Sequence, residues 1–540
     1  MSQLILAYTT IQMSKLLQRA NKKIGVSNAA ALLIVVSLVG QVLGFLRYKM
    51  VNANFSAYGP QSTDAYFAAF KIPDFFFFTF AAGALGVAFI PVLAERLEKG
   101  DRKGAWALTG SLLNLLAIIM LVIGVIMFVF AKPLIHNVVG SGLSPEQTDN
   151  AVAIMRLISF NPFLFAVSGV LTNAQQAFGR FFFFAIGPVV YNIAIIISVL
   201  LFRDSVGLVG LGIGALAGAV LQLGVALLGL LDANFHWSPR IMWKSSDFRV
   251  ILRQLPPRSI DQGVDSINSI VETNIASNLR TGSISFYENA YILHTTPVIV
   301  LGNTIATASF PQLSQRLAQN RRDLFNRDFL RVLRALIWIT APVVVISYFG
   351  RAYLARMIFA KDASEIALIF GYFAVAIFFR TIYAVISRWF YAQKDTVTPL
   401  IVSLVAIALN IGLALYLSRP WMYGVAGLAL AQSIVAAVEV LVLGIIMLVR
   451  DRRLFNREFW SGVTKIVSVT GFTTVATFIM LGLYPLEAND TGVVTLGTKL
   501  ALISGVAFAV HVSLSLLFGL DEARSVTNKL RAMILKPIKW

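Results

Sequence analysis

The chain has no cysteine, little charge and few histidines. Only 13% of its 540 residues are Asp, Glu, Lys or Arg, and none is Cys. The lack of cysteine excludes disulfides, thiolate metal sites and cysteine nucleophiles. The four histidines are scattered without the spacing of metal ligands, so we expect neither a metal site nor another cofactor.

Apolar residues take the place of the missing charge. Hydrophobic residues make up 57% of the chain, and its mean hydropathy is +0.77. A soluble protein carries about 25% charged residues, and no soluble fold of this length could bury so much apolar surface. The composition predicts an all-α polytopic membrane protein. Because no P-loop and no nucleophile–base arrangement occurs, we expect a transporter and not an enzyme.

Apolar segments of about 20 residues recur between residues 28 and 518, and each is long enough to cross a hydrocarbon core of about 30 Å. They predict about fourteen transmembrane helices. The net charge of +19 is concentrated in alternate connections, such as residues 96–103, 240–253 and 316–334. Basic connections face the cytoplasm, so both termini are predicted to be cytoplasmic. This pattern explains the basicity without a nucleic-acid partner.

An internal repeat divides the chain. The segment PVLAERL at residues 91–97 matches PQLSQRL at residues 311–317, which begins 220 positions later, and Asn410 follows Asn192 by 218 positions. Near-equal offsets with the same topology predict two pseudo-symmetric six-helix lobes. The predicted parts are a cytoplasmic leader (1–27), an N-lobe with spans 1–6 (28–231), a cytoplasmic inter-lobe loop (232–253), a C-lobe with spans 7–12 (254–449), two extra C-terminal spans (450–520) and a basic cytoplasmic tail (521–540).

The seventh span, residues 255–279, carries a polar stripe. At 100° per residue its polar side chains fall within an arc of about 120°. Four charges facing lipid at mid-bilayer would cost on the order of 10 kcal/mol, so the stripe must face protein or water. We favour a hydrated cavity between the lobes, and a buried network that pairs Arg258 with Asp261 or Asp265 stays open. The stripe consists of Arg258, Asp261, Gln262, Asp265, Asn268, Ser269 and Glu272.

Three charged residues of the first two spans are further candidates. Arg47 is near the outer end of the first span, where an arginine can also simply reach for the membrane interface. Asp64 opens the second span, where a carboxylate also suits a helix N-terminus. Lys71 follows two turns later within the same span. Each residue therefore has a structural and a substrate-binding interpretation.

The first two spans resemble the MurJ/MviN lipid II flippases of the multidrug/oligosaccharidyl-lipid/polysaccharide exporter superfamily. The resemblance extends over residues 28–520 and is strongest in VLGFLR at 42–47, TDAYFAAFKIP at 63–73 and AFIPVL at 88–93. It implies a two-lobed, V-shaped flippase of the bacterial cytoplasmic membrane. Its cargo would be the undecaprenyl-pyrophosphate-linked peptidoglycan precursor, moved from the cytoplasmic to the outer leaflet. Membrane lipids and wall-synthesis enzymes are the implied partners.

The sequence departs from this family at several cationic positions. Gln41 and Phe77 stand where the family has arginines, Ala82 where it has an acidic residue, and Tyr291-Ile292 where it has an Asp-Arg pair. Fewer cations would meet a pyrophosphate, which normally attracts several donors. Two alternatives therefore stay open. One is an exporter of another lipid-linked oligosaccharide or a cationic amphiphile, and the other is a transport-dead scaffold for wall synthesis.

Two overlapping sets of site residues follow. Cations and amides suit a pyrophosphate-linked head group, and carboxylates with an amide oxygen suit Na⁺ or H⁺ coupling. The predicted substrate-binding residues are Arg47, Asp64, Lys71, Arg258, Gln262 and Asp265. The predicted ion-coupling residues are Asp261, Asp265, Glu272 and Asn410.

Overall fold

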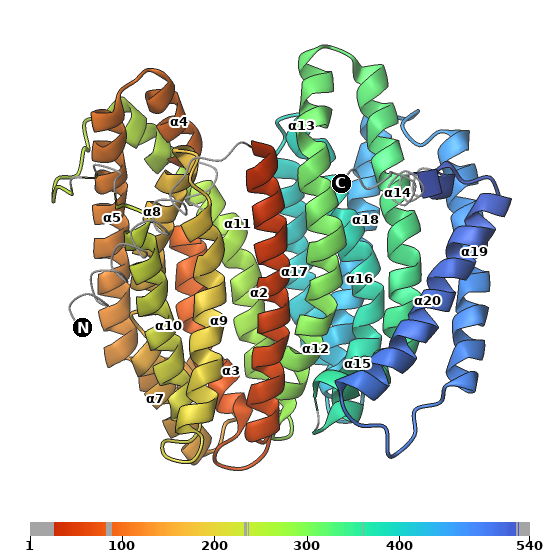
Figure 1. The fold of residues 1–540 in the computed structure, drawn as a ribbon, viewed down its shortest axis with the longest axis horizontal. Coiled ribbons are helices and arrows are strands. Elements are labelled where there is room, and N and C mark those ends of the chain that lie inside the picture. Colours follow the sequence, from red (N-terminus) through yellow and green to blue (C-terminus); the bar gives the residue numbers. More distant parts are fainter. Residues whose placement is uncertain are drawn as a thin grey trace, which may run out of the picture. The chain divides into compact units, whose positions relative to one another are not determined.

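The computed structural model describes residues 26–82, 89–231, 235, 237–359, 361–524 and 527–528, without the side chains of residues 26–31, 34, 81–82, 254 and 256–262. The predicted leader and most of the predicted tail lie outside these residues. All regular structure in the described residues is helical (Figure 1), which confirms the all-α fold class.

The chain forms two compact units, Met1–Ser285 and Phe286–Trp540. The helices of the first unit are α2 (Val26–Asn54), α3 (Thr63–Phe77), η1 (Phe78–Ala82), α4 (Ile90–Glu98), α5 (Arg102–Val129), α6 (Ala131–Leu134), η3 (Ile135–Val139), α7 (Pro145–Ile158), α8 (Asn161–Ala177), α9 (Phe182–Phe202), α10 (Val209–Leu228) and α11 (Ser246–Ser277). The helix α12 (Ser283–Pro297) begins at the end of this unit. The remaining helices belong to the second unit: η4 (Val298–Asn303), α13 (Thr304–Ala318), α14 (Arg322–Phe349), α15 (Arg351–Ile358), α16 (Ala363–Ala392), α17 (Val397–Leu417), α18 (Val425–Arg450), α19 (Arg457–Leu483) and α20 (Val493–Leu517).

Ten helices of the described chain are long and apolar enough to cross a membrane, with α7 and α8 counted as one. The polytopic membrane fold is therefore confirmed, and the count of fourteen stays a prediction. Helices α3 and α12 have 15 residues each and continue into π-helical segments, η1 and η4. Helix α11 has 32 residues, but its polar stripe lowers its hydropathy.

The repeat of 220 positions recurs in the helix bounds. Helices α5 and α14 both have 28 residues and begin at Arg102 and Arg322. Helices α3 and α12 begin at Thr63 and Ser283, again 220 positions apart, and the π-helical segments η1 and η4 follow them at the same offset. A proline precedes both π-helical segments, and its missing N–H disturbs the regular ladder of hydrogen bonds. The repeat therefore includes an interruption of the helix as well as the helices themselves.

The first unit is packed around aromatic residues and glycines. The ring of Trp106 on α5 stacks on Phe178, with centroids 4.5 Å apart. Helix α9 packs along α10 and α2 (Figure 1). A Cβ at Gly218 of α10 would lie 2.8 Å from the Tyr191 ring of α9, so only glycine allows this approach. This glycine of α10 therefore serves the packing of α10 against α9.

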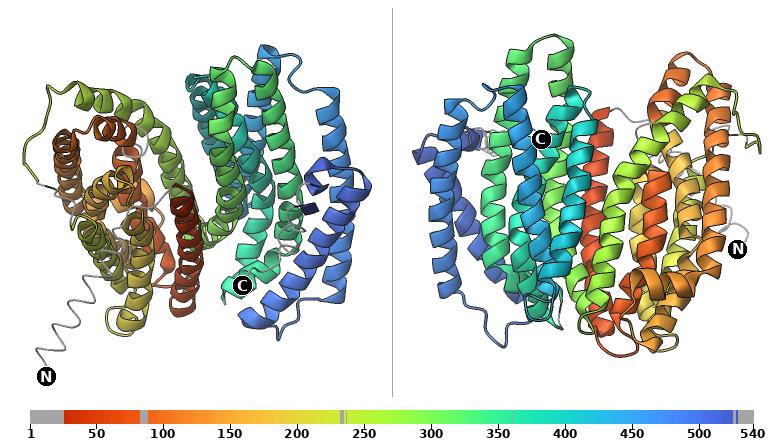
Figure 2. Two further views of the ribbon diagram at one scale, coloured as in Figure 1. Left: turned by 45° about the horizontal axis from the view of Figure 1, so that its top comes forward. Right: turned by 180° about the vertical axis from the view of Figure 1, so that it is seen from behind.

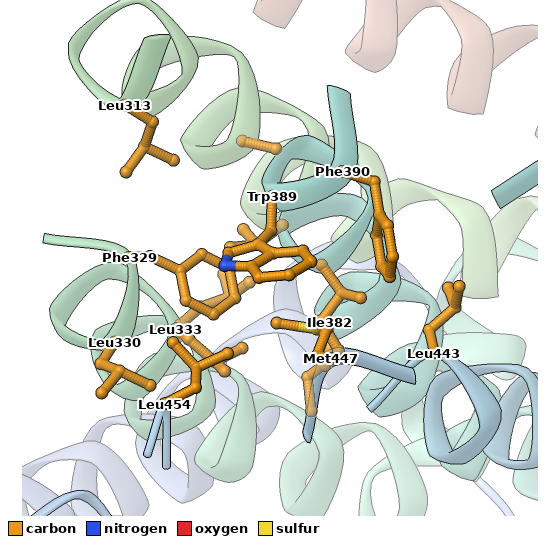
Figure 3. Close-up of a cluster of buried hydrophobic side chains, with 14 of the residues drawn as sticks. Leu313, Phe329, Leu330, Leu333, Ile382, Trp389, Phe390, Leu443, Met447 and Leu454 are labelled. Carbon is orange, nitrogen blue, oxygen red and sulfur yellow. The ribbon is translucent and has the colours of Figure 1, made fainter. Parts of the chain in front are cut away.

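The second unit has its core where α13, α14, α16 and α18 meet. Trp389, Phe329 and Met447 are buried together in it (Figure 3). The helices α19 and α20 lie side by side (Figure 2) and attach through buried polar groups. Trp338 of α14 donates through Nε1 to Ser515 Oγ of α20 at 2.8 Å, and His511 bonds the Trp338 carbonyl and Thr473 of α19. These bonds join both C-terminal helices to α14.

Candidate functional site

The C-terminal half of the polar stripe packs inside the first unit. Lys71 of α3 donates through Nζ to Ser269 Oγ of α11 at 2.8 Å. Asn268 donates through Nδ2 to Glu272 Oε1 at 3.0 Å, one turn along α11, and both side chains are buried. Asp265, one turn before Ser269, is exposed. The stripe therefore has a protein-packed end around Lys71 and a solvent-exposed carboxylate next to it.

The N-terminal half of the stripe, residues 258–262, is described by its backbone alone. Helix α11 runs unbroken from Ser246 to Ser277, so the helical spacing used to predict the stripe holds. The side chains of Arg258, Asp261 and Gln262 lie outside the described residues. Their roles, and the pairing of Arg258 with an aspartate, stay predictions.

Asp64 lies at the turn that precedes α12. Its Oδ1 accepts hydrogen bonds from the N–H and the Oγ of Ser285 at 2.8 and 2.6 Å, and its Oδ2 accepts from the Gly282 N–H at 2.7 Å. Ser62, and not Asp64, caps α3, because its Oγ accepts from the Asp64 N–H. The buried carboxylate thus serves the orphan N–H groups of another helix. No spacing in the sequence indicates these partners.

Arg47 is partly buried and lies among aromatic side chains. Its guanidinium is 5.2 Å from the centre of the Tyr48 ring. It also interacts electrostatically with Tyr66 of α3, Tyr191 of α9 and the carboxylate of Asp74. Arg47 is therefore directed at its own unit, and a phosphate bound there would compete with Asp74. Asp74 is a site candidate that the sequence-based sets omit, although it is a lone charge before four phenylalanines.

The positions that differ from the family contribute packing. The ring of Phe77, which stands at a family arginine, packs edge-on against Phe165 of α8 with centroids 5.5 Å apart. Gln41 lies on α2 and is partly buried, whereas the side chain of Ala82 is not described. Tyr291 on α12 contacts His294 and Phe373. The charges that the family places at Phe77 and Tyr291 are thus replaced by aromatic contacts.

The second unit holds a buried ion pair that the predicted sets omit. Arg380 of α16 donates through Nη1 to Glu439 Oε2 of α18 at 3.2 Å. Ser403 of α17 donates to the other oxygen of Glu439 at 2.7 Å and contacts the hydroxyl of Tyr383 at 2.9 Å. Asn410 is buried on α17, seven residues after Ser403 and hence on the same helix face. The candidate ion ligand Asn410 therefore shares a face with this network.

The predicted ion-coupling residues fall in both units. Asp265 and Glu272 belong to the first unit, and Asn410 belongs to the second. In the part of the chain that the structure describes, no three His, Asp or Glu side chains gather as a metal site. The structure brings Lys71 together with the C-terminal half of the stripe, and Arg380 together with Glu439 and Ser403.

Comparison with known proteins supplies the family. The family model described as lipid II flippase MurJ matches residues 59–497. The probable lipid II flippase MurJ of Buchnera aphidicola is 24% identical over 491 residues, which cover 89% of this chain and 93% of that protein. The probable lipid II flippase MurJ of Vibrio cholerae is 27% identical over 431 residues, covering 74% of this chain and 79% of that protein.

Solved structures share the fold. A lipid II flippase MurJ in an inward closed conformation superposes with a TM-score of 0.72 at 22% identity, and the match covers 92% of this chain and all of that one. An inward-facing multidrug resistance transporter of the MATE family gives a TM-score of 0.67 at 17% identity, with 78% of this chain and 98% of that chain covered. Because the family model spans most of the sequence, the chain belongs to the lipid II flippase MurJ family.

Proposed function

We propose that this protein moves lipid II, the polyprenyl-pyrophosphate-linked peptidoglycan precursor, from the cytoplasmic to the outer leaflet by alternating access. The observation that carries the proposal is the family match over residues 59–497. The polar cluster of Lys71, Ser269 and Glu272 within apolar helices supports it, because intramembrane charges mark substrate or ion pathways.

The proposed substrate contacts come from the first unit. Lys71 and Arg47 supply cations, Arg258 and Gln262 would add donors from α11, and the exposed Asp265 would meet amide or hydroxyl groups of the cargo. Asp64 would act by holding the turn before α12 in place.

Coupling to Na⁺ or H⁺ is proposed for the carboxylates of α11 and for Asn410. Glu272 is buried and accepts a hydrogen bond from Asn268, so a change in its charge would alter the free energy of the site strongly. Asp261 and Asp265 extend the same face of α11. The test is transport in proteoliposomes with an imposed Na⁺ or H⁺ gradient, and equal rates with either gradient or none would contradict coupling.

The proposed location is the bacterial cytoplasmic membrane, with both termini in the cytoplasm. Basic residues support it, because arginines and lysines cluster in residues 96–103, 240–253 and 316–334, where α4 meets α5, α10 meets α11 and α13 meets α14. Wall-synthesis enzymes are proposed as partners on the strength of the family alone.

The decisive experiment is complementation in cells depleted of their own lipid II flippase. We expect the wild-type chain to restore growth and lipid II translocation, and Lys71→Ala to lower translocation at least tenfold because Ser269 loses its cationic partner. Lys99→Ala is the matched control, since Lys99 is exposed and forms an ion pair with the exposed Glu95. A wild-type chain that inserts normally but restores nothing would overturn the proposal.

One observation favours a second function, export of a different cargo. Phe77 and Tyr291 replace charged family positions, while Asp74 and Asp265 are exposed carboxylates of the first unit. An excess of carboxylates would suit a cationic amphiphile, and another lipid-linked oligosaccharide is the other alternative cargo. Mass spectrometry of lipids that copurify with the protein separates these cargoes. A scaffold without transport would instead keep its function when Arg258→Ala and Asp261→Ala are combined.

A further inference from the structure

A second site candidate lies in the second unit, apart from the charged residues discussed above. A cavity of about 930 Å³ opens where α13, α14, the start of α19 and the segment after α20 meet. It lies at the end of α14 that carries the arginine-rich connection 316–334. Neither the proposed substrate contacts nor the proposed ion ligands line it.

One wall of this cavity is apolar. Leu330, Leu454 and Phe459 belong both to the cavity wall and to the buried core of the unit, where Leu330 and Leu454 lie beside Phe329 (Figure 3). Trp338 and Ile339 extend the wall along α14. A wall of this kind accommodates a hydrocarbon chain and disfavours a fully hydrated ligand.

The charged part of the cavity has two poles. At the first pole, Arg334 is the one cation among the described residues that pairs with three carboxylates: it bonds Glu522 and lies 3.6 Å from Asp521 and 4.0 Å from Glu458. Both Asp521 and Glu458 are largely exposed. This pole therefore has an excess of negative charge.

The second pole is positive. Arg327 and Arg331 line the cavity and share one carboxylate, Asp328, at 4.0 and 3.8 Å. Asp328 is already bonded by Arg316 at 3.0 Å, so three arginines face a single acid. Arg327 and Arg331 remain about two-thirds exposed, and Arg453 adds a further cation to the wall. The cavity thus presents an arginine pole that suits a phosphate.

Two buried oxygens at the cavity lack a donor. Glu522 is only 4% exposed, and its Oε1 bonds Arg334, but its Oε2 has no hydrogen-bond partner among the described residues. Asn326 Oδ1 is buried in the same wall and likewise has no donor there, while its Nδ2 bonds Asp451. Buried acceptors are normally satisfied, so these oxygens indicate a donor that the described residues do not supply.

We propose that this cavity binds a membrane phospholipid whose head group joins a primary ammonium to a phosphate, the phosphoethanolamine class. The ammonium, with three N–H donors, satisfies Glu522 Oε2 and Asn326 Oδ1 and balances Glu458 and Asp521. The phosphate accepts from Arg327 and Arg331. An acyl chain lies along Trp338. Both poles and the apolar wall are needed for this ligand, and a lipid without an ammonium uses only one pole.

Three lipids with identical acyl chains test this assignment on the purified, delipidated full-length protein by native mass spectrometry. Phosphatidylethanolamine has the ammonium N–H donors, phosphatidylcholine keeps the charge but has no N–H, and phosphatidylglycerol has no ammonium. We expect phosphatidylethanolamine to bind about tenfold more tightly than either, since a hydrogen bond to a charged group is lost in both. Equal binding of phosphatidylethanolamine and phosphatidylcholine would overturn the proposal.

Substitutions in the cavity wall test whether this cavity causes the preference for phosphatidylethanolamine. Glu522→Gln should lower phosphatidylethanolamine binding to the level of phosphatidylcholine, and Arg331→Ala should weaken all three lipids. Glu522 also bonds Arg334, so its substitution affects that ion pair as well. Asn326→Ala removes the other acceptor, Asn326 Oδ1, and leaves the Arg334–Glu522 pair intact. Arg419→Ala, an exposed arginine that does not line the cavity, is the matched control. If the variants at Glu522 and Asn326 are folded by thermal unfolding and both keep the wild-type preference, the lipid binds elsewhere.

Discussion

At the scale of single residues, burial decides which charged side chains contribute most to the stability of the folded protein. Glu439 is 2% exposed and depends on two donors, Arg380 and Ser403. An exposed ion pair such as Arg321 with Asp323 adds little to stability, because water and salt screen the attraction between its charges. A buried pair behaves differently, since losing one partner leaves the other charge without compensation.

Arg380→Met should therefore destabilise the protein strongly. The Glu439 carboxylate would keep only the hydrogen bond from Ser403, at a cost of about 3–5 kcal/mol. Adding Glu439→Gln removes the uncompensated charge, so the double variant should be more stable than Arg380→Met alone. Thermal unfolding in detergent measures both. Arg321→Ala serves as the control with little change, and a wild-type melting temperature for Arg380→Met would refute the role of the pair.

The residues of the site were only partly accessible from sequence. The stripe on α11 follows from helical spacing, and Glu272, Asn268 and Ser269 do share contacts within the first unit. The partners of Asp64 at Gly282 and Ser285 are more than 200 positions away, so they depend on packing that no local pattern records. The partner of Ser403, Glu439, likewise depends on packing, because the sequence around Ser403 does not distinguish it from any other serine in an apolar span.

At the scale of elements, apolar runs predicted helices well but gave no sign of the π-helical segments. In η4, Gly302 packs against α16, where an added Cβ would lie 3.1 Å from Thr381 Cα and 3.3 Å from its carbonyl oxygen. These are backbone atoms, which move only with the whole helix. The glycine therefore sets how closely η4 approaches α16.

Gly302→Ala should destabilise the second unit by about 1–3 kcal/mol, because the extra methyl group overfills a packed interface. The matched variant is Gly412→Ala on α17, where no atom lies within 4 Å of an added Cβ. There alanine should be neutral or stabilising by up to about 1 kcal/mol, through its higher helix propensity. Melting temperatures of the two variants give the comparison. Equal values would show that Gly302 is not needed for this contact.

A second element-scale feature links α16, α17 and α18. Asp395 follows α16, and its carboxylate accepts from the Val397 and Thr398 N–H groups, from Thr398 Oγ1 and from Arg450 Nη1 of α18 at 2.6 Å. Partial burial raises the pKa of Asp395, but the bonds from Thr398 and the Arg450 ion pair outweigh burial and hold the pKa at about 2. The ionised carboxylate therefore stabilises the folded state.

Asp395→Asn should lower the melting temperature at pH 7. Since the folded pKa lies below that of an unfolded aspartate, the contribution is present above about pH 4 and is lost as pH falls toward about 2. The difference between variant and wild type should shrink across that window when unfolding is followed in an acid-tolerant detergent. Asp204→Asn, at an exposed aspartate that pairs with its neighbour Arg203, should show no such convergence. A difference that stays constant down to pH 2 would contradict the low pKa.

At the scale of the whole molecule, the internal repeat and the packing of the helices divide the chain at different positions. Helices α2 and α11 begin 220 positions apart, as repeat equivalents would, yet α11 packs with α3 and η1 in the first unit. The first unit therefore extends to Ser285, beyond the inter-lobe loop that the repeat predicts at residues 232–253. The internal repeat identifies equivalent helices. Which neighbours a helix contacts depends on the side chains of that helix and of the neighbour. The predicted lobe boundaries stay a prediction.

The absence of cysteine makes the predicted orientation directly testable. Single cysteines can be labelled without background, so Lys103→Cys in the first turn of α5 and Asp204→Cys in the connection from α9 to α10 report opposite sides. Both positions are exposed. With basic connections in the cytoplasm, a membrane-impermeant maleimide should label only the Asp204→Cys variant in intact spheroplasts and both variants after lysis. Labelling of Lys103→Cys before lysis would reverse the proposed topology, and with it the leaflet from which the lipid substrate is taken.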